Sequence, residues 1–363
     1  YQDQGENEKA LETYTKALSI HREIGNKRSE SITLGNMATV YQDQVKYEKA
    51  LESYTKAIDI ARTIGNKVFE GVTLGNIAIL YQEEGAYERS IEYYILSIEI
   101  AREIGNKSSE GITLGNIAII YQKKGEVEKA LEQYAKALDI HREIGNKCYE
   151  GITLGNMGEL YHSLNDDTKA QEFLEKAIQI CDETLPAAAG AFRGTLALIL
   201  AKDGEVNQAL TLIETGESQI EIMPNEHGKF LCKKAQVLHI AEKQVLSLEA
   251  LNQAVEIAEK LSVSPESDLG QLIRETHEAL GLAPPPKPTP TRELTEEEED
   301  LLLEAEDLLE RGRVEEAESL YDEAMVFYDK AMTLFEQFNN AKGIIETLIE
   351  QAKVERNRGD NNA

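Results

Sequence analysis

A period of 40 residues runs through the first half of the chain and limits what it can fold into. A Thr-Leu-Gly-Asn tetrapeptide recurs at 33–36, 73–76, 113–116 and 153–156, and a Gly-Asn-Lys tripeptide recurs in the same register at 25–27, 65–67, 105–107 and 145–147. Such regular self-similarity is typical of stacked structural repeats, each of which buries its apolar face only against its neighbours. We therefore expect a linear array of small units.

Each block has the hydrophobic spacing of two helices. In the block that begins at Gly25, Leu34, Ala38 and Tyr41 recur at spacings of three and four, which places them on one helical face. A second set with the same spacing includes Tyr54 and Ala57. The small alanines let neighbouring helices approach closely, and the tyrosines fill the space between them. The pattern predicts a helix-turn-helix unit.

Glycines mark the turns between the predicted helices. Gly85 and Gly125 follow the first helix of their blocks, where helices commonly end in a left-handed residue. Val45 stands at this position in one block and should be strained, because a branched side chain disfavours that conformation. After the second helix, Gly65 can end it and Asn66 can cap the next one.

The repeated positions resemble the signature of the tetratricopeptide repeat; they are Ala38, Tyr41, Gly85, Ala50, Tyr54 and Ala57. The 40-residue form with Leu-Gly-Asn is similar to the repeats of cell-polarity adaptors, of kinesin light chains and of bacterial arrays. The resemblance implies an all-α fold, an α-solenoid in which helix-turn-helix repeats form a right-handed superhelix with a concave groove.

The repeats degrade along the chain and suggest four segments. Residues 1–183 form the regular array, and residues 184–281 read as degenerate helical repeats. Residues 282–292 contain a proline cluster that predicts an extended linker. In residues 293–363 the repeat signature returns, which predicts a C-terminal helical unit. Because the pattern is cut at both ends, we expect the chain to be part of a longer polypeptide.

The charge of the chain disfavours several classes of partner. A formal net charge of −28 argues against nucleic acid and against anionic membrane surfaces, and it favours a basic peptide or protein. The sequence has no apolar run long enough to span a membrane. Its three cysteines are far apart and form no disulfide or zinc pattern, so we expect a cytoplasmic protein.

We find no pattern that predicts an enzyme within these residues. The recurrent motifs of hydrolases, nucleotide-binding folds and metalloproteases are missing, so we expect no catalytic residues, no metal and no cofactor. His21 and His141 share a repeat position that holds Ala61 and Ala101 in sister blocks, and we expect them at the surface.

Four asparagines recur inside the first predicted helix of each block, where asparagine is a poor helix former; they are Asn36, Asn76, Asn116 and Asn156. They lie away from the Tyr/Ala face, on the side expected to line the groove. An amide offers both a donor and an acceptor, and the resemblance implies that it pairs with the backbone of an extended peptide. In the alternative reading the asparagines bridge adjacent repeats.

A second group of candidate peptide-binding residues lies one to two turns further along the same helices; it comprises Thr39, Ile79 and Ile119, followed by Gln42, Gln82 and Gln122. Asp43, Glu83 and Lys123 follow directly, and the chemistry of the group changes from repeat to repeat, as a specificity surface would. In the alternative reading they are exposed positions that drift freely.

The sequence therefore predicts a protein-interaction scaffold that binds a peptide or partner segment in its groove. One alternative is a regulatory or sensor region of a larger enzyme, such as a caspase-like CHAT protease or a signalling NTPase, whose catalytic module lies outside these residues. Another is a structural protein that self-assembles into homo-oligomers through its repeat ends.

Overall fold

The computed structural model describes residues 2–282, 296–317, 320–337, 343–344, 346–351 and 353–354. The regular secondary structure in these ranges is α-helical. In chain order, the helices are α1 (Gln2–Glu23), α2 (Lys27–Asp43), α3 (Tyr47–Thr63), α4 (Lys67–Glu83), α5 (Tyr87–Glu103), α6 (Lys107–Lys123), α7 (Val127–Glu143), α8 (Lys147–Ser163), α9 (Asp167–Thr184), α10 (Pro186–Lys202), α11 (Val206–Ile220), α12 (Pro224–Ile240), α13 (Gln244–Lys260), α14 (Asp268–Ala279), α15 (Glu296–Ala317) and α16 (Tyr321–Gln337). The predicted all-α class is confirmed.

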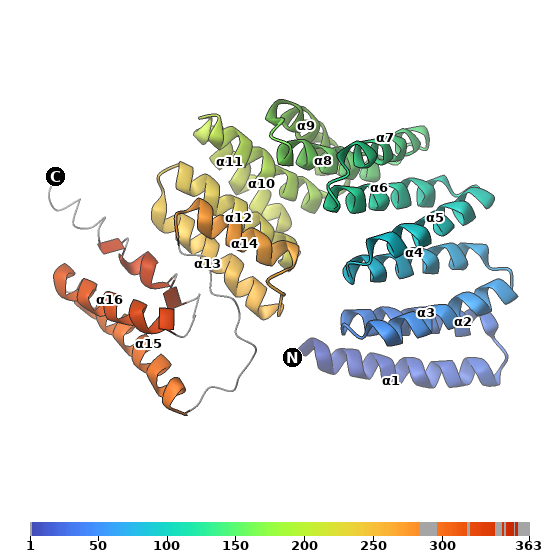
Figure 1. Ribbon diagram of the computed structural model, residues 1–363, viewed down its shortest axis with the longest axis horizontal. Coiled ribbons are helices and arrows are strands. Elements are labelled where there is room, and N and C mark those ends of the chain that lie inside the picture. The colour runs from blue at the N-terminus through green and yellow to red at the C-terminus, as the bar shows by residue number, and fades with distance from the viewer. Residues whose placement is uncertain are drawn as a thin grey trace. The chain divides into compact units, whose positions relative to one another are not determined.

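The chain divides into two compact units, residues 1–157 and residues 158–363. In the first unit α1 to α7 stack in chain order, each against its neighbours in sequence (Figure 1). Helices α2, α4, α6 and α8 are the first helices of successive repeats, and α3, α5 and α7 are the second helices. This tandem packing of helix pairs is the solenoid arrangement that the 40-residue period predicts.

The core of the first unit uses the same residues in every repeat. Tyr54, Tyr94 and Tyr134 are only 1% exposed, and Ala38 and Ala78 are completely buried. The alanine allows close approach of the helices, and the tyrosine fills the resulting space to the density of a protein interior. Because the packing positions repeat, the pattern of the sequence determines the stacking of the helices.

In the first unit, a buried glutamate ties each second helix to the first helix of the next repeat. Asn66 caps α4 by accepting a hydrogen bond from the Phe69 amide at 3.2 Å. Glu70, 5% exposed, accepts one from Arg62 Nε at 2.7 Å and lies 3.5 Å from Lys67 Nζ. The same arrangement recurs in three sister turns, and we refer to the four as the glutamate staples; the other three are centred on Glu30, Glu110 and Glu150.

Replacing Val45 with glycine is expected to stabilise the protein by about 0.5–1.5 kcal/mol. Val45 has a φ of 58°, where its sister residues are Gly85 and Gly125, and its side chain is 68% exposed, so truncation loses little packing. Thermal unfolding measures the gain. Asn165→Gly is the matched control, because Asn165 has the same φ but asparagine tolerates it, so its gain should be smaller. Equal or opposite effects would contradict the strain at Val45.

The expectation that His141 lies at the surface is wrong. The side chain is 1% exposed, and its ring stacks on Tyr149 with centroids 5.4 Å apart. Burial lowers the pKa of His141, and the charge of Glu150 only partly opposes this. Ala61 and Ala101 hold the same position and are also buried, so the alanines mark a packing site between helices.

In the second unit, α9 to α14 continue the helix-pair pattern. Pro186 and Pro224 begin α10 and α12, where a missing amide hydrogen does no harm. Residues 283–292 of the predicted linker lie outside the described residues. The four-segment division of the chain stays a prediction.

Candidate functional site

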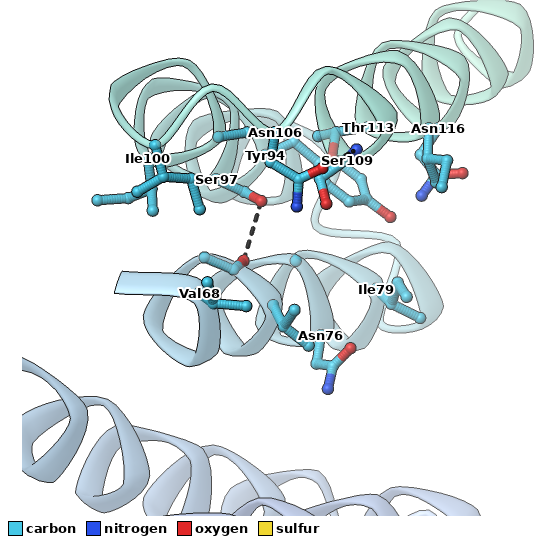
Figure 2. A pocket seen from close by; sticks show the side chains of 16 residues that line it. Val68, Asn76, Ile79, Tyr94, Ser97, Ile100, Asn106, Ser109, Thr113 and Asn116 are labelled. Carbon is cyan, nitrogen blue, oxygen red and sulfur yellow. Dashed lines mark hydrogen bonds between the residues drawn. The ribbon is translucent and has the colours of Figure 1, made fainter. Parts of the chain in front are cut away.

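The four repeated asparagines occupy equivalent places on successive first helices. Asn36, Asn76, Asn116 and Asn156 are each the tenth residue of their helix. Asn36 is exposed and the other three are half-buried. Figure 2 shows Asn76 on α4 and Asn116 on α6, both extending from the same side of their helices. We call these four residues the asparagine ladder.

An apolar row runs beside the ladder and was missed by the sequence reasoning. One turn before each asparagine stands a branched aliphatic residue; the row is Ile32, Val72, Ile112 and Ile152. Ile32 is 39% exposed and Val72 is 50% exposed. The signal was present in the sequence, because an aliphatic side chain at i−4 from every asparagine shares its helical face.

A pocket of about 180 Å³ lies where the ladder and the apolar row meet, between α4 and α6. Its walls include Val72, Asn76 and Ile79 from α4, and Ile112 and Asn116 from α6. Figure 2 shows its floor, where Ser97 of α5 donates a hydrogen bond to the Gly71 carbonyl at 2.9 Å. This contact holds α5 against α4, so the pocket is a preformed feature of the stacked repeats.

Of the predicted site residues, the pocket therefore brings together Asn76, Asn116 and Ile79. Asn36 and Asn156 carry the ladder to the neighbouring first helices. Thr39 is exposed, and its hydroxyl lies 3.1 Å from that of Tyr54. Ile119 is half-buried.

The predicted glutamines have a structural contact in each repeat. Gln42, Gln82 and Gln122 accept hydrogen bonds from the hydroxyls of Tyr54, Tyr94 and Tyr134, at 3.2, 3.5 and 3.1 Å respectively. These bonds join the end of each first helix to the core tyrosine of the second helix. The glutamines therefore orient the tyrosine hydroxyls that border the ladder.

Asn116 also contacts a core tyrosine of the preceding repeat. Burial raises the pKa of Tyr94, a hydrogen bond with Asn116 acts in the opposite direction, and the charge of Glu83 raises the pKa further. Asn116 therefore has a structural contact as well as a place in the pocket wall, so the two readings of the ladder are compatible at this residue.

Two carboxylates, Asp43 and Glu83, are the last residues of α2 and α4, the first helices of adjacent repeats. The pKa of Glu83 is raised, first because neighbouring groups remove part of the water around its carboxyl and then because the charge of Asp43 lies nearby. A hydrogen bond with Gln42 only partly offsets these effects. The site is electrostatically negative, and a cation placed there would relieve the repulsion.

In the second unit, other residue types occupy the helix position that holds asparagine in the ladder. Thr195 and Lys233 are the tenth residues of α10 and α12. Lys233 Nζ lies 2.9 Å from Glu159 Oε1 and 2.6 Å from Thr195 Oγ1, and Thr195 donates to Glu159 at 2.8 Å. Burial acts to raise the pKa of Glu159, but Lys233, Thr195 and Lys229 together outweigh burial and lower that pKa. Glu159, Thr195 and Lys233 therefore each find their hydrogen-bond or ion-pair partners in the other two.

The parts of the chain that the structure describes contain no cluster of three or more His, Cys, Asp or Glu side chains arranged to hold a metal ion. Within the same parts, none of the helices combines the length and the apolar character that crossing a bilayer requires.

The chain is similar to several solved structures. The apo form of RapI is 20% identical, with a TM-score of 0.55 over 72% of this chain and 94% of RapI. NprR from B. thuringiensis is 17% identical, with a TM-score of 0.49 over 74% of this chain and 82% of NprR. BtubC from P. vanneervenii is 16% identical, with a TM-score of 0.47 over 80% of this chain and 98% of BtubC.

A search of curated proteins gives no significant match. The family model of the tetratricopeptide repeat matches residues 1–63, 69–143 and 109–183. Its matches cover the helix pairs whose buried alanines and tyrosines recur every 40 residues. Through residues 1–183, the chain therefore belongs to the tetratricopeptide repeat family.

Proposed function

We propose that the ladder side of the first unit binds an extended segment of a peptide or partner protein, and that the role of these residues is binding rather than catalysis. The pocket between α4 and α6 carries this proposal. It combines aliphatic side chains that remain exposed in a folded chain with amides that can pair with a peptide backbone.

The asparagine ladder supplies the part of recognition that does not depend on the ligand sequence. Each amide can donate to a peptide carbonyl and accept from a peptide amide. Asn76 and Asn116 lie in the wall of one pocket, and their equivalents on α2 and α8 extend the row. The contact with Tyr94 limits the freedom of Asn116 before a ligand arrives, which reduces the entropy lost on binding.

The apolar row supplies the part that does depend on the ligand sequence. Val72 of the row is 50% exposed and the neighbouring pocket residue Ile79 is 37% exposed, so an aliphatic ligand side chain can cover both. Full burial of such a side chain contributes about 1.5–3 kcal/mol. The pocket volume of about 180 Å³ suits one side chain of medium size.

A basic residue in the ligand would add an electrostatic attraction to the backbone and apolar contacts. Glu83 ends α4, one of the pocket helices, and Asp43 ends α2, so both carboxylates lie at helix C-termini, where cations are favoured. The net charge of −28 attracts basic ligands and repels nucleic acid and anionic membranes. The buried cysteine Cys232 is a free thiol, which fits a role in the cytoplasm.

The test uses a peptide selected from a random library against the full chain. Alanine at positions 36, 76, 116 and 156 together is expected to weaken its affinity about 100-fold or more, because each lost pair contributes roughly 0.5–1.5 kcal/mol. Fluorescence anisotropy measures the affinity, and circular dichroism confirms that the variant folds. A matched variant with alanine at Lys56, Lys136 and Lys176, outside the ladder, should bind normally. Unchanged affinity in the ladder variant would overturn the proposal.

A further inference from the structure

The outer face of α5 departs from a pattern that its sister helices share. Helices α1, α3, α7 and α9 each carry a glutamate and a lysine four residues apart that form an ion pair; the pairs are Glu12–Lys16, Glu52–Lys56, Glu132–Lys136 and Glu172–Lys176, at 2.5–2.6 Å. In α5 the glutamate is kept as Glu92, but Leu96 stands in place of the lysine.

A second apolar residue stands beside Leu96. Ile95 is 47% exposed and Leu96 is 42% exposed, whereas α3 has Thr55 and Lys56 at these places. The stacking of the repeats does not require them, because Tyr94 and Ile98 make the core contacts of α5. Exposed aliphatic side chains lower solubility, so an exposed pair in only one of five equivalent helices calls for a partner.

Carboxylates flank the apolar pair along the helix. Glu92, Ile95, Leu96 and Glu99 follow the spacing of one helical face and are all exposed; we call them the α5 patch. The two glutamates are seven residues apart, which corresponds to about 10 Å along the helix. Between its two carboxylates this face of α5 has no cation, whereas α3 has Lys56 between Glu52 and Asp59.

We propose that the α5 patch docks a basic amphipathic helix of a partner protein. Two helices that pack side by side interdigitate their apolar side chains at an axial distance of about 8–10 Å. Lysines or arginines seven residues apart on the incoming helix would then reach Glu92 and Glu99, one at each end of the apolar contact. The patch is separate from the pocket, to which α5 contributes Tyr94, Ser97, Ile100 and Ala101.

A second copy of the chain is a poor candidate for the partner that binds the α5 patch. A two-fold symmetric contact places the same patch on both sides, so carboxylates would face carboxylates across the apolar pair. Each copy also carries a net charge of −28. Like charges opposite one another oppose association, whereas a basic helix supplies both the apolar and the electrostatic complement.

The probe is a synthetic helical peptide with leucines on one face flanked by lysines seven residues apart, and its matched partner has glutamates in place of the lysines. Anisotropy with the full chain is expected to show binding of the lysine peptide only. The double variant Ile95→Thr with Leu96→Lys should weaken that binding at least tenfold. It restores the residues of α3, so it is expected to fold, and circular dichroism checks this.

Two further measurements distinguish binding at the α5 patch from binding in the groove and from self-association. The double variant Asn76→Ala with Asn116→Ala should bind the lysine peptide normally, which separates the α5 patch from the proposed groove function. Equal binding of both peptides, or unchanged binding by the Ile95→Thr, Leu96→Lys variant, would overturn the proposal. So would sedimentation that shows the native chain to be a dimer and Leu96→Lys to be a monomer, because the occupant would then be a second copy.

Discussion

Replacing Tyr94 with alanine is expected to lower the free energy of unfolding by about 3–5 kcal/mol. The side chain is 1% exposed, fills the space between α4, α5 and α6, and shares its cluster with Ala78, Ile98 and Leu114. In a stacked array each repeat is held by its neighbours, so a cavity at this position also weakens the contact between repeats. Denaturant unfolding should show a lower midpoint, and hydrogen exchange should locate the loss in α4 to α6.

Tyr94→Phe is the matched control, because it keeps the ring and removes only the hydroxyl. We expect a change of about 1 kcal/mol or less in stability, since the bond to Gln82 is long at 3.5 Å. The same variant frees Asn116 from its tyrosine contact and should weaken peptide binding by a few fold. If alanine were tolerated as well as phenylalanine, Tyr94 would not be the packing centre of its repeat.

Glu110→Gln is expected to destabilise the protein by about 1–3 kcal/mol. The carboxylate is 5% exposed and accepts a hydrogen bond from Arg102 Nε at 2.7 Å, with Lys107 Nζ at 3.4 Å. The amide keeps the volume but loses the charge that draws both cations to it. Thermal unfolding measures the change. Glu103→Gln is the control, because its pair with Lys67 is exposed and contributes about 0–1 kcal/mol.

The glutamate staples also predict how stability depends on acid. The pKa of Glu110 is lowered from its ordinary value of 4.5, because Arg102 and Lys107 outweigh the opposing effect of burial. The pKa values of Glu30 and Glu150 are lowered as well. Their contribution is therefore complete above about pH 4.5 and is lost as the pH falls through the folded pKa values. The Glu110→Gln variant should lose less stability over this range, and an equally steep loss would contradict the assignment.

Much of the fold could be predicted from the sequence because every packing position is repeated. The spacing of Ala38, Tyr54 and Ala57 predicted two helices per block, and Gly65 with Asn66 predicted where one helix ends and the next begins. Each of these signals is local and recurs every 40 residues, so the blocks support one another.

The details of the candidate site were less accessible, since they depend on which side chains remain exposed after stacking. The sequence picked out Asn76 and Ile79 but not Val72, because an aliphatic residue at helical spacing is usually part of a core. His141 was misplaced for a related reason: substitution for alanine looked like surface variation, whereas the position is a packing site that accepts an imidazole ring.

We propose that an extended segment lies against the ladder and the apolar row of the first unit. The most direct measurement places a photoactivatable cross-linking residue at position 72 in the full chain, with position 56 as the control, and adds the library-selected peptide. Position 72 lies in the pocket wall and position 56 on the outer face of α3. Cross-links to the peptide from position 72 but not from position 56 are the predicted result. Cross-links from position 56 alone, or equally from both, would show that the peptide does not lie along the ladder.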